Sequence, residues 1–123
     1  MAIFKNLLII DDDKSSARSI YSALHERSFR IDFATSIKEG LQLLKTGVYD
    51  SIVFGMELYG QSDKIIWEQA LKLKKPTCFV GIGNKKSQSE YTISQEAKFD
   101  VYLSKPIKLR SINSLLRVNS TKS

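Results

Sequence analysis

The sequence is poor in cysteine, histidine and proline, with one, one and two of them among 123 residues. A single cysteine excludes an internal disulfide, and Cys78 lies in the apolar run TCFV, which indicates a buried structural thiol. No apolar run approaches the roughly 20 residues that a membrane-spanning helix needs, and the opening MAIFKNLLII meets three aspartates too early for a signal peptide. We therefore expect one cytoplasmic domain that has no membrane contact.

Positive charge is concentrated in the second part of the chain. Residues 1–71 hold 8 Lys/Arg and 10 Asp/Glu, whereas residues 72–123 hold 11 and 3, so the two parts carry −2 and +8 of the total of +6. Such a basic surface either meets an acidic partner or only keeps the protein in solution. Direct nucleic-acid binding is a further alternative, and it would show an affinity that falls with salt. The sequence contains no helix-turn-helix or aromatic-basic motif that supports it.

Five short apolar runs bounded by turn residues predict strands, at residues 7–10, 29–34, 51–54, 78–80 and 101–103. Continuous rather than alternating runs are typical of strands that are buried on both faces of a parallel sheet.

Helical periodicity separates these strands. We expect helices after Asp13 and Ser36, both placed as N-caps, then at about 63–73, at about 87–97 and from Pro106 onward. Gly47 closes the second helix, and Ile66, Ala70 and Leu73 form the core face of the third. The helix at 87–97 is polar, so it is either loosely packed or an interaction surface.

Five strands alternating with five helices predict a three-layer, doubly wound α/β domain, which we place at residues 1–118, with a polar tail at 119–123. Ligands bind at the carboxyl ends of the strands in such sheets. The first strand ends in Asp11-Asp12-Asp13, and these carboxylates repel one another unless a cation, a lysine or helix amides compensate them. On the triplet alone, a metal site and a solvated turn capped by Asp13 are equal alternatives.

A lysine is directed at the same edge of the sheet. Pro106 favours an extended conformation for Lys105, which follows the last strand. The only histidine, His25, lies in the first helix away from the strand ends, and no glycine-rich phosphate loop opens that helix. We therefore expect no enzymatic activity.

The chain resembles the receiver domain of two-component response regulators over residues 6 to about 117. The resemblance rests on LLIIDDD followed by Arg18, then YDSIVFG, KKPTCFVG and FDVYLSKPI, in this order. The resemblance implies a flavodoxin-like (βα)5 fold with a five-stranded parallel sheet in the order 2-1-3-4-5. Receivers accept a phosphoryl group from a histidine kinase on an aspartate at the end of the third strand. By resemblance, Asp11 and Asp12 hold Mg²⁺, Lys105 contacts the phosphoryl oxygens and Tyr102 is the aromatic switch position.

The chain departs from the receiver pattern at the acceptor. That aspartate falls on Gly55, the hydroxyl residue that reads the phosphorylated state falls on Gly81, and the small residue after it falls on Ile82. Glycine has no side chain to attack a phosphoryl group, and the branched Ile82 is expected to fill the pocket entrance with apolar atoms. The loop after the third strand is changed as well, with Tyr59 where receivers have proline.

Loss of the acceptor also weakens the expected metal site. Mg²⁺ prefers octahedral oxygen ligands, so Asp11 and Asp12 alone predict weak or absent Mg²⁺ binding, and no other cofactor is expected. Glu57 borders the pocket two residues past Gly55. We expect Lys105 to be neutralised by Asp11, Asp12 or Glu57 in a fixed ion-pair cluster, the alternative being that Glu57 lies in water.

These observations predict a pseudo-receiver, a signalling module that acts through protein contacts without phosphoryl chemistry. Its expected partner is another signalling protein of acidic character, and a homodimer through the same surface is an alternative. The predicted contact surface comprises Lys85, Lys86, Lys98, Tyr102, Lys108 and Arg110. Whether Tyr102 protrudes or packs inward stays open. Phosphorylation on Asp50, Glu57 or Asp13 is a competing hypothesis, which the placement of Asp50 before the strand and of Glu57 beyond it disfavours.

Overall fold

The structure is a computed structural model that describes residues 5–25, 27–74, 78–84, 99–108 and 110. Its elements are β1 (Lys5–Ile10), α1 (Lys14–Leu24), β2 (Phe29–Ala34), α2 (Ile37–Thr46), β3 (Ser51–Gly55), α3 (Met56–Gln61), α4 (Lys64–Lys74), β4 (Cys78–Gly83) and β5 (Val101–Ser104). The helix expected at 87–97 lies outside the described residues. The helix expected from Pro106 onward does not begin there, because Pro106, Ile107 and Lys108 are not helical. Arg110 is helical, and the rest of that segment lies outside the described residues.

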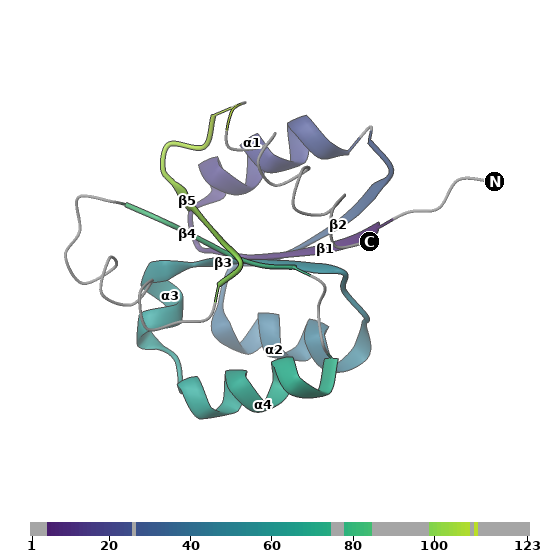
Figure 1. The fold of residues 1–123 in the computed structure, drawn as a ribbon, viewed down its shortest axis with the longest axis vertical. Helices are drawn as coiled ribbons and strands as arrows, with labels where there is room; N and C mark the ends of the chain where they lie inside the picture. Colours follow the sequence, from purple (N-terminus) through teal and green to yellow (C-terminus); the bar gives the residue numbers. More distant parts are fainter. Residues whose placement is uncertain (1–4, 26, 75–77, 85–98, 109, 111–123) are drawn as a thin grey trace.

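The strands form one parallel sheet in the order β2-β1-β3-β4-β5, as the receiver resemblance implies. Helix α1 covers one face, and α2, α3 and α4 cover the other (Figure 1). The predicted three-layer, doubly wound fold is confirmed. Because all strands run in the same direction, the residues that follow β1, β3 and β5 meet at the carboxyl edge of the sheet.

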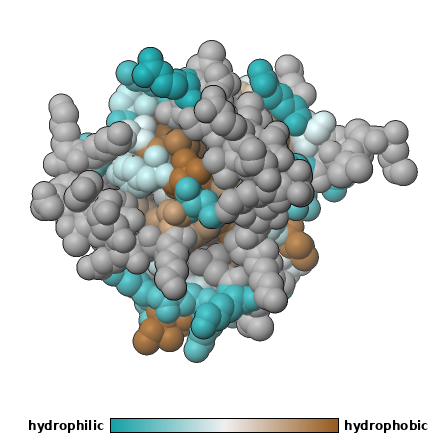
Figure 2. All heavy atoms as spheres, viewed as in Figure 1, coloured by the Kyte–Doolittle hydropathy of each residue, from teal (hydrophilic) through white to brown (hydrophobic). Residues whose placement is uncertain are grey.

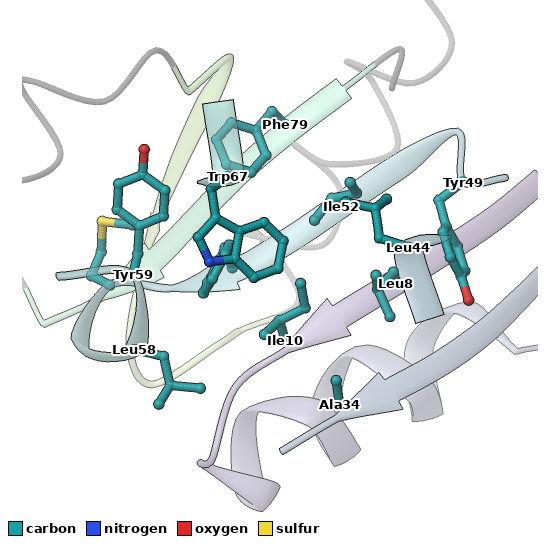
Figure 3. Close-up of a cluster of buried hydrophobic side chains, with 12 residues drawn as sticks. Leu8, Ile10, Ala34, Leu44, Tyr49, Ile52, Leu58, Tyr59, Trp67 and Phe79 are labelled. Atoms are coloured by element: carbon teal, nitrogen blue, oxygen red, sulfur yellow. The ribbon is translucent and has the colours of Figure 1, made fainter. Parts of the chain in front are cut away.

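The two faces of the sheet bury different side chains. Beneath α1 the cluster is mostly aliphatic and includes Ile9, Ile20, Val53, Val80 and Ile82, all with no exposed surface. The opposite cluster is rich in aromatic rings, and Figure 3 shows the Trp67 indole packed over the sheet between Tyr59 and Ile52. The Phe54 and Trp67 ring centroids are 4.6 Å apart at 74°, an edge-to-face contact.

Local sequence explains where the first two long helices begin. The Asp13 side chain accepts hydrogen bonds from the Ser15 and Ser16 N–H groups at the start of α1. The Ser36 hydroxyl accepts the Glu39 N–H at 3.2 Å, and the Glu39 side chain accepts the Thr35 N–H at 3.1 Å. Both predicted N-caps are confirmed, although the Glu39 carboxylate bonds to the residue before the expected one.

Helix α3 was not predicted from the sequence. It begins directly after Gly55 and buries Met56, Leu58 and Tyr59, so the segment beside the strand ends is an ordered helix and not a loop. The predicted core face of α4 was only partly right, because Ala70 packs against the core but Ile66 does not, and the side chain of Leu73 is not described. Trp67 is completely buried there, whereas Ile66 is 47% exposed. The large indole packs edge-to-face on Phe54 in this core position.

Hydrophobic side chains also reach the surface in several places, seen as brown areas on the face in Figure 2. The large exposed ones are Tyr21, Phe33, Val48, Ile65 and Ile66. Across the described part of the chain, no helix combines the length and the apolar character that crossing a membrane requires.

Candidate functional site

The three consecutive aspartates after β1 have different environments. Asp11 is 3% exposed, Asp12 is exposed and Asp13 lies between these extremes. The Asp11 N–H donates to the Ala34 carbonyl at 3.0 Å, which continues the pairing of β1 with β2 by one residue. The Asp13 N–H donates to Asp11 Oδ1 at 3.2 Å, so the turn into α1 directs the Asp11 carboxylate inward.

Lys105 places its ammonium between two of these carboxylates. Its Nζ lies 3.0 Å from Asp11 Oδ2 and 3.1 Å from Asp13 Oδ2. The Lys105 N–H donates to the Gly83 carbonyl at 2.8 Å, which fixes the residue at the carboxyl ends of β4 and β5. The approach to Asp11 Oδ2 has the distance of an ion pair without the alignment of a hydrogen bond.

The charges shift the pKa values of all three groups. Burial raises the pKa of the Asp11 carboxyl, and the Asp13 N–H and the Lys105 ammonium do not offset this effect. Asp13 carries a burial penalty too, but Lys105 and Ser16 outweigh it and lower its pKa. Burial alone would lower the pKa of Lys105, and the carboxylates of Asp11 and Asp13 raise it instead. The ammonium therefore stays charged at neutral pH.

The Asp11 carboxylate occupies the space beside Gly55 where a side chain would begin. A Cβ built on Gly55 would lie 2.6 Å from Asp11 Oδ1 and 2.7 Å from Asp11 Cγ, closer than a Cβ atom approaches its neighbours in folded proteins. The backbone of Gly55, with φ −66° and ψ 129°, suits any residue. A side chain at residue 55 is therefore opposed by contact with Asp11 and not by the backbone conformation.

Two further glycines on β4 lie against hydrophobic side chains. A Cβ on Gly81 would lie 3.1 Å from Met56 Cε and 3.2 Å from the Phe99 ring. A Cβ on Gly83 would lie 2.9 Å from Met56 Cβ and 3.0 Å from the Tyr102 hydroxyl. The β4 backbone is thus covered where receivers carry the hydroxyl residue, by side chains from α3 and from the segment around β5.

The structure corrects part of the expected ion-pair cluster. Lys105 contacts Asp11, as one of the alternatives had it, but its second partner is Asp13. Asp12 and Glu57 are exposed, so Glu57 follows the alternative that left it in water. From the sequence, Asp13 was considered as an N-cap, as part of the acidic triplet and as a substitute phosphorylation site, but not as a partner of Lys105 in the ion-pair cluster. In fact one oxygen caps α1 while the other faces Lys105, a double role that its position at the helix start permits.

Ile82 packs in the hydrophobic cluster beneath α1, with no exposed surface. It does not line the cavity of about 510 Å³ beside Lys105, whose described lining residues are Asp13, Ser15, Ser16, Ser19, Asn84, Lys105, Pro106 and Ile107. The expectation that Ile82 fills the pocket entrance was wrong, because the alternation along β4 directs its side chain into the α1 core.

The donor set at this edge fits a divalent cation poorly. Mg²⁺ would need carboxylate oxygens, and both Asp11 and Asp13 already face the Lys105 ammonium. Gly55 supplies no side-chain ligand, and Asp12 is exposed. Among the described residues, no three His, Cys, Asp or Glu side chains are grouped as a metal site would require.

The predicted partner surface is only partly described. Lys108 and Arg110 are exposed, whereas Lys85, Lys86 and Lys98 lie outside the described residues. The Tyr102 hydroxyl is buried, and the ring packs against the aromatic cluster. Of the two orientations left open for Tyr102, the structure has the inward one, so Tyr102 offers a partner only part of its ring.

Comparison with known proteins connects this fold to response regulators. No family model matches the chain. The transcriptional regulatory protein DltR of Streptococcus agalactiae is 22% identical over 117 residues, which cover 95% of this chain and 52% of DltR, so the chain spans about half of that relative. The Francisella response regulator 1452 receiver domain is 27% identical, with a TM-score of 0.70 and 96% of each chain covered.

A third similar protein is a Burkholderia pseudomallei response regulator whose crystal structure contains a phosphorylated aspartic acid, a calcium ion and citrate. It is 23% identical, with a TM-score of 0.73, and the match covers 96% of this chain and 69% of that one. The chain therefore has the fold of response-regulator receiver domains.

Proposed function

We propose that this receiver-like domain is a signalling module that works without phosphorylation and acts through protein-protein contacts. The observation that carries the proposal is the filled space beside Gly55. The position of the receiver acceptor has no nucleophile, and the Asp11 carboxylate lies where the acceptor side chain would begin.

Other carboxylates are poor substitutes for the acceptor. The Asp11 side chain is 2% exposed and ion-paired, so a phosphoryl donor does not reach it. Asp50 lies at the opposite edge of the sheet, where its carboxylate accepts the Asn6 N–H at 2.7 Å. Glu57 is exposed on the first turn of α3, outside the Lys105 cluster. Asp13 caps α1 and pairs with Lys105.

Incubation with phosphoramidate and Mg²⁺, followed by intact-mass spectrometry, tests this proposal. The expected result is an unchanged mass, with the Burkholderia pseudomallei response regulator as the positive control, because a phosphorylated aspartic acid is present in its structure. Addition of one acid-stable, base-labile phosphoryl group to this chain would contradict the proposal and would identify a substitute carboxylate by peptide mapping.

The proposed partner is an acidic signalling protein that contacts the basic surface containing Lys108 and Arg110, both exposed. We expect the double variant Lys108→Glu, Arg110→Glu to lose partners recovered by affinity capture at low salt. Lys72→Glu, a charge reversal at an exposed position of α4, is the matched control and should retain them. If the wild type, the double variant and Lys72→Glu recovered the same partners in equal amounts, this surface would not be the contact site. Concentration-dependent sedimentation tests the homodimer alternative.

A further inference from the structure

The Lys105 ammonium has the position that a bound cation would take at this edge. It lies 3.0 Å from Asp11 Oδ2 and 3.1 Å from Asp13 Oδ2, between the two carboxylates. The Asp11 side chain is 2% exposed, and that of Lys105 is 26% exposed, so the contact is largely screened from water. A divalent cation would have to compete for the same oxygens.

A second observation is independent of Lys105. The Asp11 carboxylate points over Gly55, where a Cβ would lie 2.6 Å from its Oδ1. This orientation is available only because residue 55 has no side chain. Gly55 therefore has two effects. It removes the acceptor carboxylate from this edge of the sheet, and it lets the Asp11 carboxylate turn away from solvent.

We propose that Lys105 is the resident cation of this edge, a tethered ammonium that holds Asp11 over Gly55 and excludes Mg²⁺. The inference deepens the proposed function and rests on it, because a site working without phosphorylation has no need of a metal. The competition favours the lysine, since a tethered partner acts at an effective concentration on the order of millimolar or above. A Mg²⁺ ion would also have to lose some of its bound water molecules to reach a buried carboxylate oxygen, and Mg²⁺ loses water reluctantly.

The test is a titration of the full chain with Mg²⁺ and with paramagnetic Mn²⁺, read from amide NMR signals. Wild type should show no site-specific shift or broadening at Asp11, Asp12 and Asp13 up to millimolar metal. Lys105→Met keeps the apolar stem and removes the charge, so it should bind Mn²⁺ at least about tenfold more tightly than wild type, because two carboxylates lose their counter-ion. Lys105→Gln is a second neutral variant in case the first does not fold.

Lys38→Met is the matched control. Lys38 is an exposed lysine in the first turn of α2, outside the cluster, and its variant should behave as wild type. Specific Mg²⁺ binding at the aspartates of wild type would overturn the inference, and so would a folded Lys105 variant with no gain in Mn²⁺ affinity. If neither Lys105 variant folds, the Mg²⁺ and Mn²⁺ titration of the wild type decides whether the inference holds.

Failure of this inference is distinguishable from failure of the proposed function. Mg²⁺ binding by wild type without phosphorylation would overturn the resident-cation role and leave the phosphorylation-independent function intact. Phosphorylation of the chain would contradict the proposed function whatever the metal titration shows.

Discussion

The carboxyl ends of β3 and β4 present two glycines, Gly55 and Gly81, where the receiver pattern has functional side chains, and their spaces are filled in different ways. A carboxylate fills the space beside Gly55, and the hydrocarbon groups of Met56 and Phe99 fill the space beside Gly81. The first arrangement depends on a counter-ion and on protonation, because Asp11 is buried next to Lys105. The second depends on packing alone.

This difference makes the two strand ends respond differently to substitution and pH. At β3, a new atom collides with a charged group that is held by Lys105 and by the Asp13 N–H. At β4, a Cβ on Gly81 would meet the flexible end of Met56 at 3.1 Å and the Phe99 ring at 3.2 Å. Both distances are at least 0.5 Å longer than the 2.6 Å between a Cβ on Gly55 and Asp11 Oδ1. We therefore expect larger, pH-dependent effects at Gly55 and smaller, pH-independent effects at Gly81.

The largest effect is predicted for Gly55→Asp. A carboxylate at residue 55 displaces Asp11 and adds a third charge around Lys105, so the free energy of unfolding should fall by about 3 kcal/mol at neutral pH. Urea denaturation measures it. Gly55→Ala adds only the Cβ and should lose about 1–2 kcal/mol. Equal stability of Gly55→Asp and wild type would show that the space beside Gly55 is available to an acceptor.

The next effect is that of Lys105→Met. The Asp11 carboxylate becomes a buried charge without its ammonium, and we expect a loss of about 2 kcal/mol at pH 7, reduced by the partial exposure of Lys105. Chemical denaturation over a pH series measures the loss. An unchanged stability at neutral pH would contradict the ion-pair account.

The loss in Lys105→Met should shrink toward acid pH. The pKa of Asp11 is raised in the folded protein, so the native state binds more protons than the unfolded state between the ordinary value of 3.8 and the folded pKa. Asp11 therefore adds stability at low pH, and this stability is lost as pH rises through that window. Without Lys105 the folded pKa rises further, which strengthens the trend.

Gly81→Ala should have a smaller effect than Gly55→Ala. Its Cβ meets Met56 Cε at 3.1 Å, and a methionine end can move by a few tenths of an ångström. We expect a loss of at most about 1 kcal/mol, with no change between pH 5 and pH 8 because no titratable group is involved. A loss larger than that of Gly55→Ala would reverse the comparison between the two strand ends.

Asp13→Asn should have the smallest effect. Asparagine retains the N-cap of α1 and removes only a partly exposed ion pair, so we expect about 0.5 kcal/mol at pH 7. The pKa of Asp13 is lowered, so its contribution is present above 3.8 and is lost as pH falls through the folded pKa. The wild-type and variant stability curves should therefore converge in acid. A constant difference across the pH range would assign the effect to the cap instead.

The fold was predictable because each element has a local signal. The runs at β1 and β3 are continuous and apolar, and Asp13 and Ser36 have the spacing of N-caps. Helix α3 lacks such a signal, since Gly60 interrupts it and Gly55 provides no side-chain cap. It forms because Met56 and Tyr59 are buried against the sheet, which is a tertiary effect.

The candidate site was predictable in composition but not in arrangement. Sequence reasoning brought Asp11 and Lys105 to one edge, since parallel strands end together. It missed Asp13 as the second partner of Lys105, because the cap geometry that turns one oxygen toward the helix and the other toward β5 is set by the turn. It also missed the Asp11 carboxylate beside Gly55, which depends on a side-chain rotamer.

A crystal structure of the protein grown in MgCl₂ tests the central claim most directly. We predict that the Asp11 carboxylate lies over Gly55 with Lys105 Nζ in contact, as in the present structure, and that no metal occupies the edge. A Mg²⁺ ion bound by Asp11 and Asp12, with Lys105 turned away from both, would contradict the account.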